Sequence, residues 1–174
     1  MTARKSGGIT SALAAFIAVS AVAASGATVT LAPPSGTTTN VLALYAGETS
    51  VEISGPGTVS LNPANTYTGG TTLSGGTLAY SGTYHDGVSP LGSGALNITG
   101  GTISGSGTIA NDITATAAAS FAPKGTLVLS GNNTITGALQ VQTNTLEIAG
   151  GTTTVAGISL APLQRNGPSS SERR

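Results

Sequence analysis

After residue 27, apolar and polar residues alternate in short runs that end at glycine. Large apolar residues stand at every second position in most runs, as Leu146 and Ile148 do. This period of two, in runs rich in Val, Ile and Thr, predicts β-strands with one buried face. The predicted strands are 41–45, 49–54, 58–61, 71–73, 77–81, 95–99, 102–104, 108–114, 126–130, 138–142, 145–149 and 152–155. No segment after residue 27 carries a helical period with caps.

The glycine breaks recur along the chain. Gly-Gly-Thr occurs at 69–71, 75–77, 100–102 and 150–152. Recurrent breaks between short strands predict a parallel coil whose turns, or rungs, are about 18–25 residues long. Glycine suits the rung corners because it tolerates positive φ and close backbone approach. Threonine suits the exposed strand face, where it can hydrogen-bond to its copy on the next rung.

One longer segment also returns. GTVSLNPANTYTG at 57–69 and GTLVLSGNNTITG at 125–137 are identical at seven of thirteen positions, 68 residues apart. Self-similarity at a fixed offset is typical of repeat architectures, in which each unit buries its apolar face only by stacking on the next. Such a chain is more typical of a scaffold or surface fibre than of an enzyme built around one cleft.

Composition narrows the choice of function. Only 7% of the 174 residues are charged and the formal net charge is zero, whereas an ordinary soluble domain has about 25% charged residues. No long-range field would therefore attract nucleic acid or an anionic membrane. The chain has no Cys, no Trp and two Phe. We expect a thin aliphatic core that ladder hydrogen bonds, rather than disulfides, stabilise.

The chain ends differ from the middle. Residues 1–27 are typical of a secretory signal peptide, with Arg4 and Lys5 ahead of an apolar run and small residues at 25–27. We expect residues 28–54 to form an N-terminal β segment or cap, and 55–161 to form the repeats. Residues 162–174 hold half of the Lys and Arg, and we interpret them as a disordered tail or the product of a shifted reading frame.

The segment from Leu61 to Leu78 resembles the autotransporter-associated β-strand repeat. The positions that match its pattern N-x-Y-x-G-x-T-x-φ-x-x-G-x-L are Asn65, Tyr67, Gly69, Thr71, Leu73, Gly76 and Leu78. The segment at 125–137 is a degenerate copy, with Ile135 in place of the tyrosine. Later steps such as Leu91–Leu96 and Gly105–Ile109 are also similar to the family, and the resemblance covers roughly residues 55–160.

The resemblance implies a right-handed parallel β-helix passenger of a bacterial type V secreted protein. Such a passenger is exposed at the cell surface, on the outer membrane, or shed outside the cell. Its export would need an outer-membrane translocator barrel, and the sequence to residue 174 shows no barrel-like run of strands with aromatic girdles. The chain is therefore expected to be a fragment, to rely on another protein for export, or to stop in the periplasm.

The residues that could carry chemistry are few. His85 is the only histidine and stands beside Asp86 without a nucleophile motif, so we interpret it as a loop residue. Glu48 and Glu52 share parity but precede the first clear repeat, and charges that discourage edge aggregation account for them. We expect no catalytic residue, no cofactor, no metal site and no small-molecule substrate. Tyr45, Tyr67, Tyr80 and Tyr84 are more typical of packing than of sugar stacking.

Three functions remain open. The first is a structural or adhesive scaffold that binds glycans or host or abiotic surfaces through many weak contacts. The second is a carbohydrate-active lyase or hydrolase on a β-helix, which a cluster of charges on one face would favour. The third is an ice-binding or amyloid-like surface, suggested by the T-x-T pairs at 66/68, 134/136 and 152/154. Their unequal spacing disfavours the alignment that this third function needs.

Overall fold

The computed structural model describes residues 15–17, 26–61, 64–82 and 89–160. Within these residues every regular element is a β-strand. In chain order the strands are β1 (Ala15–Ile17), β2 (Thr28–Leu31), β3 (Thr38–Val41), β4 (Ser50–Ile53), β5 (Thr58–Ser60), β6 (Thr71–Leu73), β7 (Thr77–Gly82), β8 (Leu96–Ile98), β9 (Thr102–Ile109), β10 (Ile113–Ala115), β11 (Ala119–Leu129), β12 (Asn133–Val141), β13 (Thr145–Ile148) and β14 (Thr153–Leu160).

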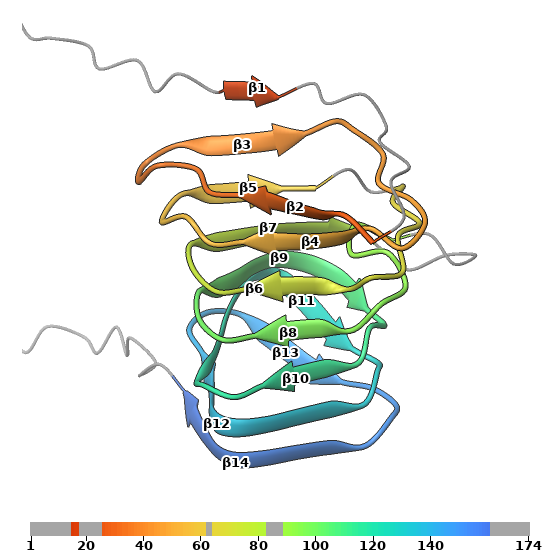
Figure 1. Ribbon diagram of the computed structural model, residues 1–174. Coiled ribbons are helices and arrows are strands. Elements are labelled where there is room, and N and C mark those ends of the chain that lie inside the picture. The colour runs from red at the N-terminus through yellow and green to blue at the C-terminus, as the bar shows by residue number, and fades with distance from the viewer. Residues whose placement is uncertain (1–14, 18–25, 62–63, 83–88, 161–174) are drawn as a thin grey trace, which may run out of the picture.

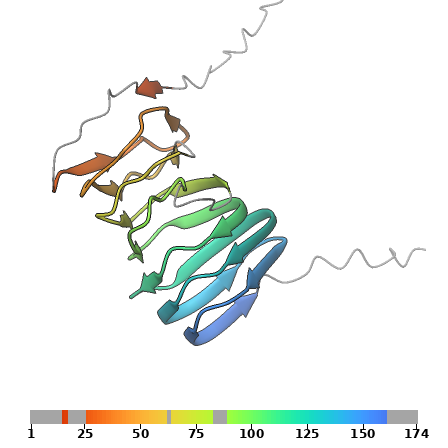
Figure 2. The same cartoon turned by 90° about the vertical axis from the view of Figure 1, so that its right-hand side faces the viewer.

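The chain winds as a parallel β-solenoid, as the sequence predicted. From β2 to β10 successive strands alternate between two faces, and each pairs in parallel with a strand of the next rung, as β6 pairs with β8. The even face is the outward side of β2, β4, β6, β8, β10 and the first halves of β12 and β14. The odd face is that of β3, β5, β7 and the first halves of β9 and β11, continued by the second halves of β12 and β14. The second halves of β9 and β11 and strand β13 form a third face. Figure 1 shows both faces stacked from the N-terminal to the C-terminal end, and Figure 2 shows the stack from the side.

The ladder register gives the rung length. Partners on the even face lie 17 residues apart between Leu96 and Ile113, 20 apart between Ile113 and Asn133, and 25 apart between Thr71 and Leu96. The expected rung of about 18–25 residues is confirmed to within one residue. Longer rungs keep register because their extra residues lie in the corners rather than in the strands.

The 68-residue self-similarity does not coincide with the ladder register. Thr58 pairs with Thr77, whose column continues through Thr102 to Ser120. Thr126, the equivalent of Thr58 in the self-similarity, pairs instead with Thr145 on a different face. The similar segments 57–69 and 125–137 therefore occupy different positions in the coil, while the repeat architecture that they indicated is confirmed.

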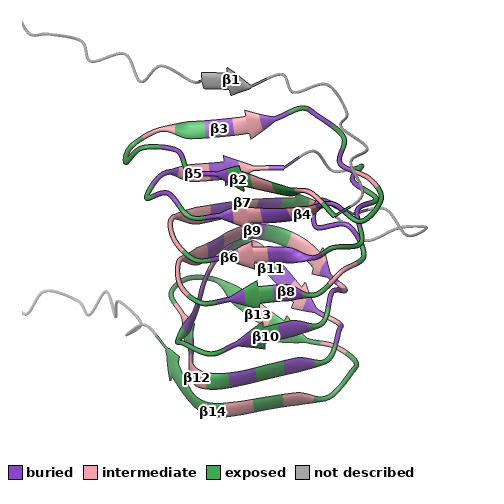
Figure 3. Cartoon of the chain, in the orientation of Figure 1, coloured by how far each residue is buried: buried purple, intermediate pink, exposed green. Residues whose placement is uncertain are grey.

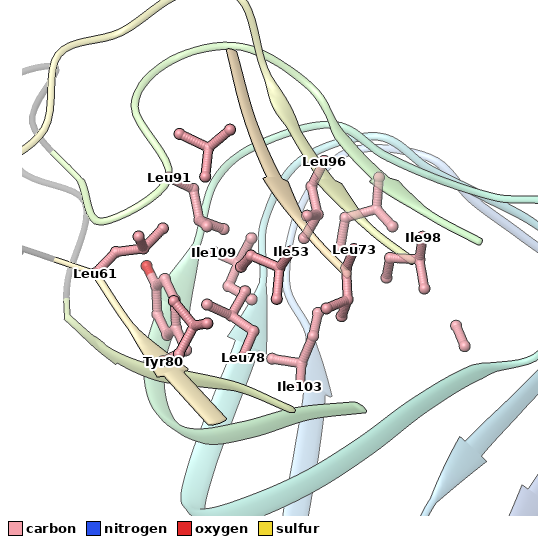
Figure 4. Packing of buried hydrophobic residues seen from close by; sticks show 14 of the residues in the cluster. Ile53, Leu61, Leu73, Leu78, Tyr80, Leu91, Leu96, Ile98, Ile103 and Ile109 are labelled. Atoms are coloured by element: carbon pink, nitrogen blue, oxygen red, sulfur yellow. The ribbon is translucent and has the colours of Figure 1, made fainter. Parts of the chain in front are cut away.

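The core is a stack of inward-facing apolar side chains between the faces, drawn in purple in Figure 3. Leu73, Leu78, Ile103 and Ile109 are fully buried and point toward one another (Figure 4). Because alternate residues of each strand face inward, every rung contributes only a few such side chains. The expected thin aliphatic core is what the stack contains, supplemented by Tyr67, Tyr80 and Phe121.

Several predicted strand bounds were correct and others were not. The strand at 71–73 matches β6, whereas 108–114 is wrong because the chain turns between Ile109 and Ile113. Both isoleucines are buried, on two sides of one corner. The predicted strand at 41–45 is also wrong, because the strand there is β3 and ends at Val41. The sequence missed β2 and the first halves of β11 and β12. In β11, Pro123 lies inside a strand that changes register between Pro123 and Leu127. A proline is tolerated at such an irregularity.

The boundary regions are only partly described. Residues 28–53 form β2, β3 and β4, which stack in the same coil as the later rungs. Of the predicted signal peptide, the structure describes 15–17, which pair with β3, and 26–27. The tail at 162–174 lies outside the described residues. In the part of the chain that the structure describes, no helix is long and apolar enough to cross a membrane.

Candidate functional site

Asn65 of the repeat motif ties three rungs together at one corner. Its side chain is fully buried, and its Oδ1 accepts the backbone N–H of Tyr45 at 2.9 Å on the preceding rung. Its Nδ2 donates to the carbonyl oxygen of Pro90 at 3.0 Å on the following rung. An amide can bridge in both directions because it carries an acceptor and a donor group. Asn65 therefore acts as a structural clamp between rungs.

Tyr67 and Thr71 form a polar pair inside the coil. Their hydroxyl oxygens lie 2.5 Å apart and both side chains are buried. The Tyr67 ring packs edge-on against Tyr45 at 6.3 Å. Desolvation by burial raises the pKa of Tyr67 above its usual value, and it raises the pKa of Tyr80 to about 12. These tyrosines pack inside the protein and are not available to stack on a sugar.

The motif glycines allow neighbouring rungs to approach. A Cβ atom on Gly69 would lie 2.5 Å from the carbonyl oxygen of Thr49. Gly76 has φ +66°, and a Cβ atom there would clash with the carbonyl oxygens of Gly55 and Gly57. Only glycine fits positions that combine positive φ with backbone contact.

The remaining motif positions are apolar and face the core. Leu73 in β6 and Leu78 in β7 are fully buried. The structure thus places all seven motif residues at corners or inside the coil, where they build the rung and do not form a ligand site. The motif marks how the chain folds, and the ligand-accessible surface is made by the residues between the motif positions.

That surface is most regular on the even face. One outward column runs through Thr30, Glu52, Thr72, Asn97, Thr114, Thr134 and Thr154, which pair in register from rung to rung. From Asn97 onward every member of the column is exposed. Two residues further along each rung lie Ser54, Ser74, Thr99, Thr116 and Thr136, all exposed. The face is therefore an ordered array of small hydroxyl and amide groups.

The three T-x-T pairs at 66/68, 134/136 and 152/154 do not align, as their unequal spacing predicted. Thr154, the second residue of its pair, stacks on Thr134, the first residue of its pair, so these two pairs are offset by two residues. Thr134-x-Thr136 stacks instead on Thr114-x-Thr116 of the preceding rung. The 66/68 pair does not join this array, since Thr66 and Thr68 lie at a corner and donate backbone N–H groups to Tyr45 and Gly47.

Hydrogen bonds between rungs differ from the expected threonine ladder. Only Thr28 and Ser50 join side chain to side chain among the hydroxyl pairs described, at 2.9 Å. Thr136 and Thr143 instead donate to backbone carbonyl oxygens of the preceding rung, at 3.0 and 2.8 Å.

Amide side chains that sequence reasoning overlooked also fix the corners. Asn132 accepts the N–H of Thr152 at 3.0 Å, and Asp112 accepts the N–H of Asn132 at 2.8 Å. Their 20-residue spacing was the signal available in the sequence. Buried Asn111 acts in the opposite direction, because its Nδ2 donates to the carbonyl oxygen of Gly94 at 2.7 Å.

The candidate acidic residues are spread over the coil. Glu52 and Asp112 both lie on the even face but three rung steps apart, about 14 Å at the usual strand spacing. A paired acid and base in a glycosidase are about 5–10 Å apart. Glu48 is exposed before β4, and His85 and Asp86 lie outside the described residues. Among the described residues no group of three His, Asp or Glu side chains could hold a metal ion.

A parallel coil of glycine-cornered rungs, with the motif directed inward, defines the fold class as a parallel β-solenoid. The family model described as passenger-associated-transport-repeat matches residues 54–79 and 124–157. These segments contain the repeat motif and the degenerate copy that the sequence indicated. The chain thus carries passenger-associated transport repeats, a type of repeat found in autotransporter passengers, and this type of repeat implies export. No curated protein and no solved structure matches the chain.

Proposed function

We propose that the protein is an exported scaffold that adheres to a surface or a glycan through its even face. The observation that supports this proposal is the column of exposed Thr and Asn side chains held in register by the ladder. Each hydroxyl or amide contributes a weak contact, and a rigid coil adds the contacts without further ordering cost. The protein would act at the cell surface or after release from it.

The spread of the carboxylates supports a scaffold rather than a carbohydrate-active enzyme. Glu52 and Asp112 are too far apart to act as an acid–base pair, and Asp112 is already bonded to Asn132. The proposal accordingly assigns no catalytic residue and no cofactor. Its partners are extended surfaces with repeated hydrogen-bonding groups, and not a small-molecule substrate.

Adhesion through many weak contacts predicts a steep dependence on surface density. Beads coated with the exported protein should be retained on glycan-coated and hydroxylated surfaces under flow, and retention should fall more than proportionally as the coating is diluted. The double variant Thr114→Lys/Thr134→Lys, which places two charges on the even face, should lose about tenfold or more of this retention. Retention counts at a fixed shear rate measure both effects.

The matched control is Thr126→Lys, because Thr126 is exposed on β11 away from the even face. It adds the same type of side chain and should leave retention unchanged. Equal losses in Thr126→Lys and the double variant would contradict adhesion through the even face.

A further inference from the structure

The last four rungs of the even face form a two-dimensional array. Asn97, Thr114, Thr134 and Thr154 make its first column, paired one to the next. Thr99, Thr116 and Thr136 make its second column, two residues further along the first three of these rungs, and all are exposed; Ala156 takes this position in the last rung. Rungs repeat at about 4.8 Å, and residues two apart on a strand are separated by about 6.7 Å. The hydroxyl groups are thus periodic in two directions, on the face whose strands β8, β10, β12 and β14 lie at the front of the coil in Figure 1.

The array is held before any ligand arrives. The Oγ1 of Thr136 donates to the carbonyl oxygen of Ala115 at 3.0 Å, which fixes its rotamer. Just before β12 and β14, Asp112 accepts the backbone N–H of Asn132, and Asn132 accepts that of Thr152. A preorganised array loses little side-chain entropy when it binds.

Charge restricts what the array can bind. Asp112 is the only charged residue on this part of the face among the described residues, and its Oδ1 accepts from both the N–H and the Nδ2 of Asn132. An uncharged face complements an uncharged partner. Tyr45, Tyr67 and Tyr80 are buried, so the described tyrosines offer no exposed ring for a sugar to stack on. These features favour a rigid, neutral lattice of hydrogen-bonding groups over an ion or an isolated sugar.

We infer that this array binds ice, the crystalline lattice of water. Each threonine offers a hydroxyl group that can hydrogen-bond to lattice water and a methyl group that is poorly hydrated. Single contacts of this kind are weak, and two-dimensional periodicity lets many form at once. This inference rests on the proposed adhesive function of the even face and names the surface that the face binds.

The odd face makes a useful contrast. Its outward column runs through Thr38, Thr58, Thr77, Thr102, Ser120 and Gln140 and ends at Ser159. Thr58, Thr77 and Thr102 are half-buried, and their neighbours two residues along include Ala79. Both faces therefore carry columns of threonine. Only the even face has two aligned columns whose side chains are exposed.

The test is incorporation of the full-length exported protein into slowly growing ice, together with thermal hysteresis of the same solution. The wild-type protein should enter the ice and lower the freezing point below the melting point. Thr114→Lys/Thr134→Lys should lose about tenfold or more of both effects, because two charged side chains interrupt adjacent rungs of the array. Thr126→Lys should behave as wild type. If circular dichroism shows that the double variant is unfolded, Thr134→Lys alone replaces it.

Exclusion of the wild-type protein from ice, or equal ice binding by the even-face variant, would overturn the inference. Retention of coated beads on hydroxylated surfaces without ice separates this failure from that of the proposed function. If ice binding fails while bead retention still depends on the even face, only the choice of ice is wrong. If the folded protein shows neither ice binding nor bead retention through the even face, the proposed adhesive function is wrong as well. Binding to crystalline polysaccharide in place of ice would likewise reject ice as the ligand.

Discussion

Leu78→Asp is expected to prevent folding of the repeat region. Leu78 is fully buried on β7 between Val59 and Ile103 of the adjoining rungs. Removing the leucine side chain from such a site costs about 2–5 kcal/mol, and an unpartnered carboxylate adds a further penalty for desolvation. The sum approaches the total stability of about 5–15 kcal/mol that a domain possesses. Protease resistance and far-UV circular dichroism should both report the loss.

Leu42→Asp is the matched control. Leu42 is 62% exposed, so the same substitution there leaves the carboxylate in water and should keep protease resistance close to wild type. Equal resistance of the two variants would mean that Leu78 is not in the core, and the inward assignment of β7 would be wrong.

Gly76→Ala is expected to give the second largest effect. The alanine would have to keep a positive φ, which costs about 1–2 kcal/mol. Its Cβ atom would also meet the carbonyl oxygens of Gly55 and Gly57 on the preceding rung, and such overpacking costs about 1–3 kcal/mol more. The midpoint of guanidinium denaturation should therefore fall clearly below that of the wild type.

Gly36→Ala separates the two causes. Gly36 also has positive φ, at +73°, but nothing lies within 4 Å of the position that its Cβ atom would take. We expect only the conformational cost there, and so a smaller shift of the midpoint. If both variants shift the midpoint equally, close contact between rungs is not what requires glycine at position 76.

The sequence was sufficient to predict the fold because its signals are local. Strand period, glycine corners and the motif from Asn65 to Leu78 all act within one rung, and the β-solenoid follows from stacking such rungs. Strand pairing was harder because register depends on corner length. Leu73 pairs with Ile98 after 25 residues, whereas Ile98 pairs with Ala115 after 17, and no local rule states how long each rung is.

The candidate surface was missed for the same reason. Thr71 and Thr72 are adjacent and identical in type, yet Thr71 is buried beside Tyr67 while Thr72 faces outward. Alternate residues of a strand face inward and outward, so the position of each threonine in the strand decides which one is buried. That position is known only once the register of the rung is fixed. Likewise, the sequence alone did not reveal that Thr134-x-Thr136 stacks on Thr114-x-Thr116, which the ladder register shows.

The most direct test of the account is a disulfide between neighbouring rungs, since the chain has no cysteine of its own. Thr114 and Thr134 are direct ladder partners, so their Cα atoms lie about 5 Å apart, within the range that a disulfide spans. Thr114→Cys/Thr134→Cys should form an intramolecular bond under mild oxidation, detected by mass and by mobility on a non-reducing gel. Thr114→Cys/Thr154→Cys, two rungs apart at about 10 Å, should not. Equal cross-linking of both pairs, or a bond only in the second, would contradict the solenoid register.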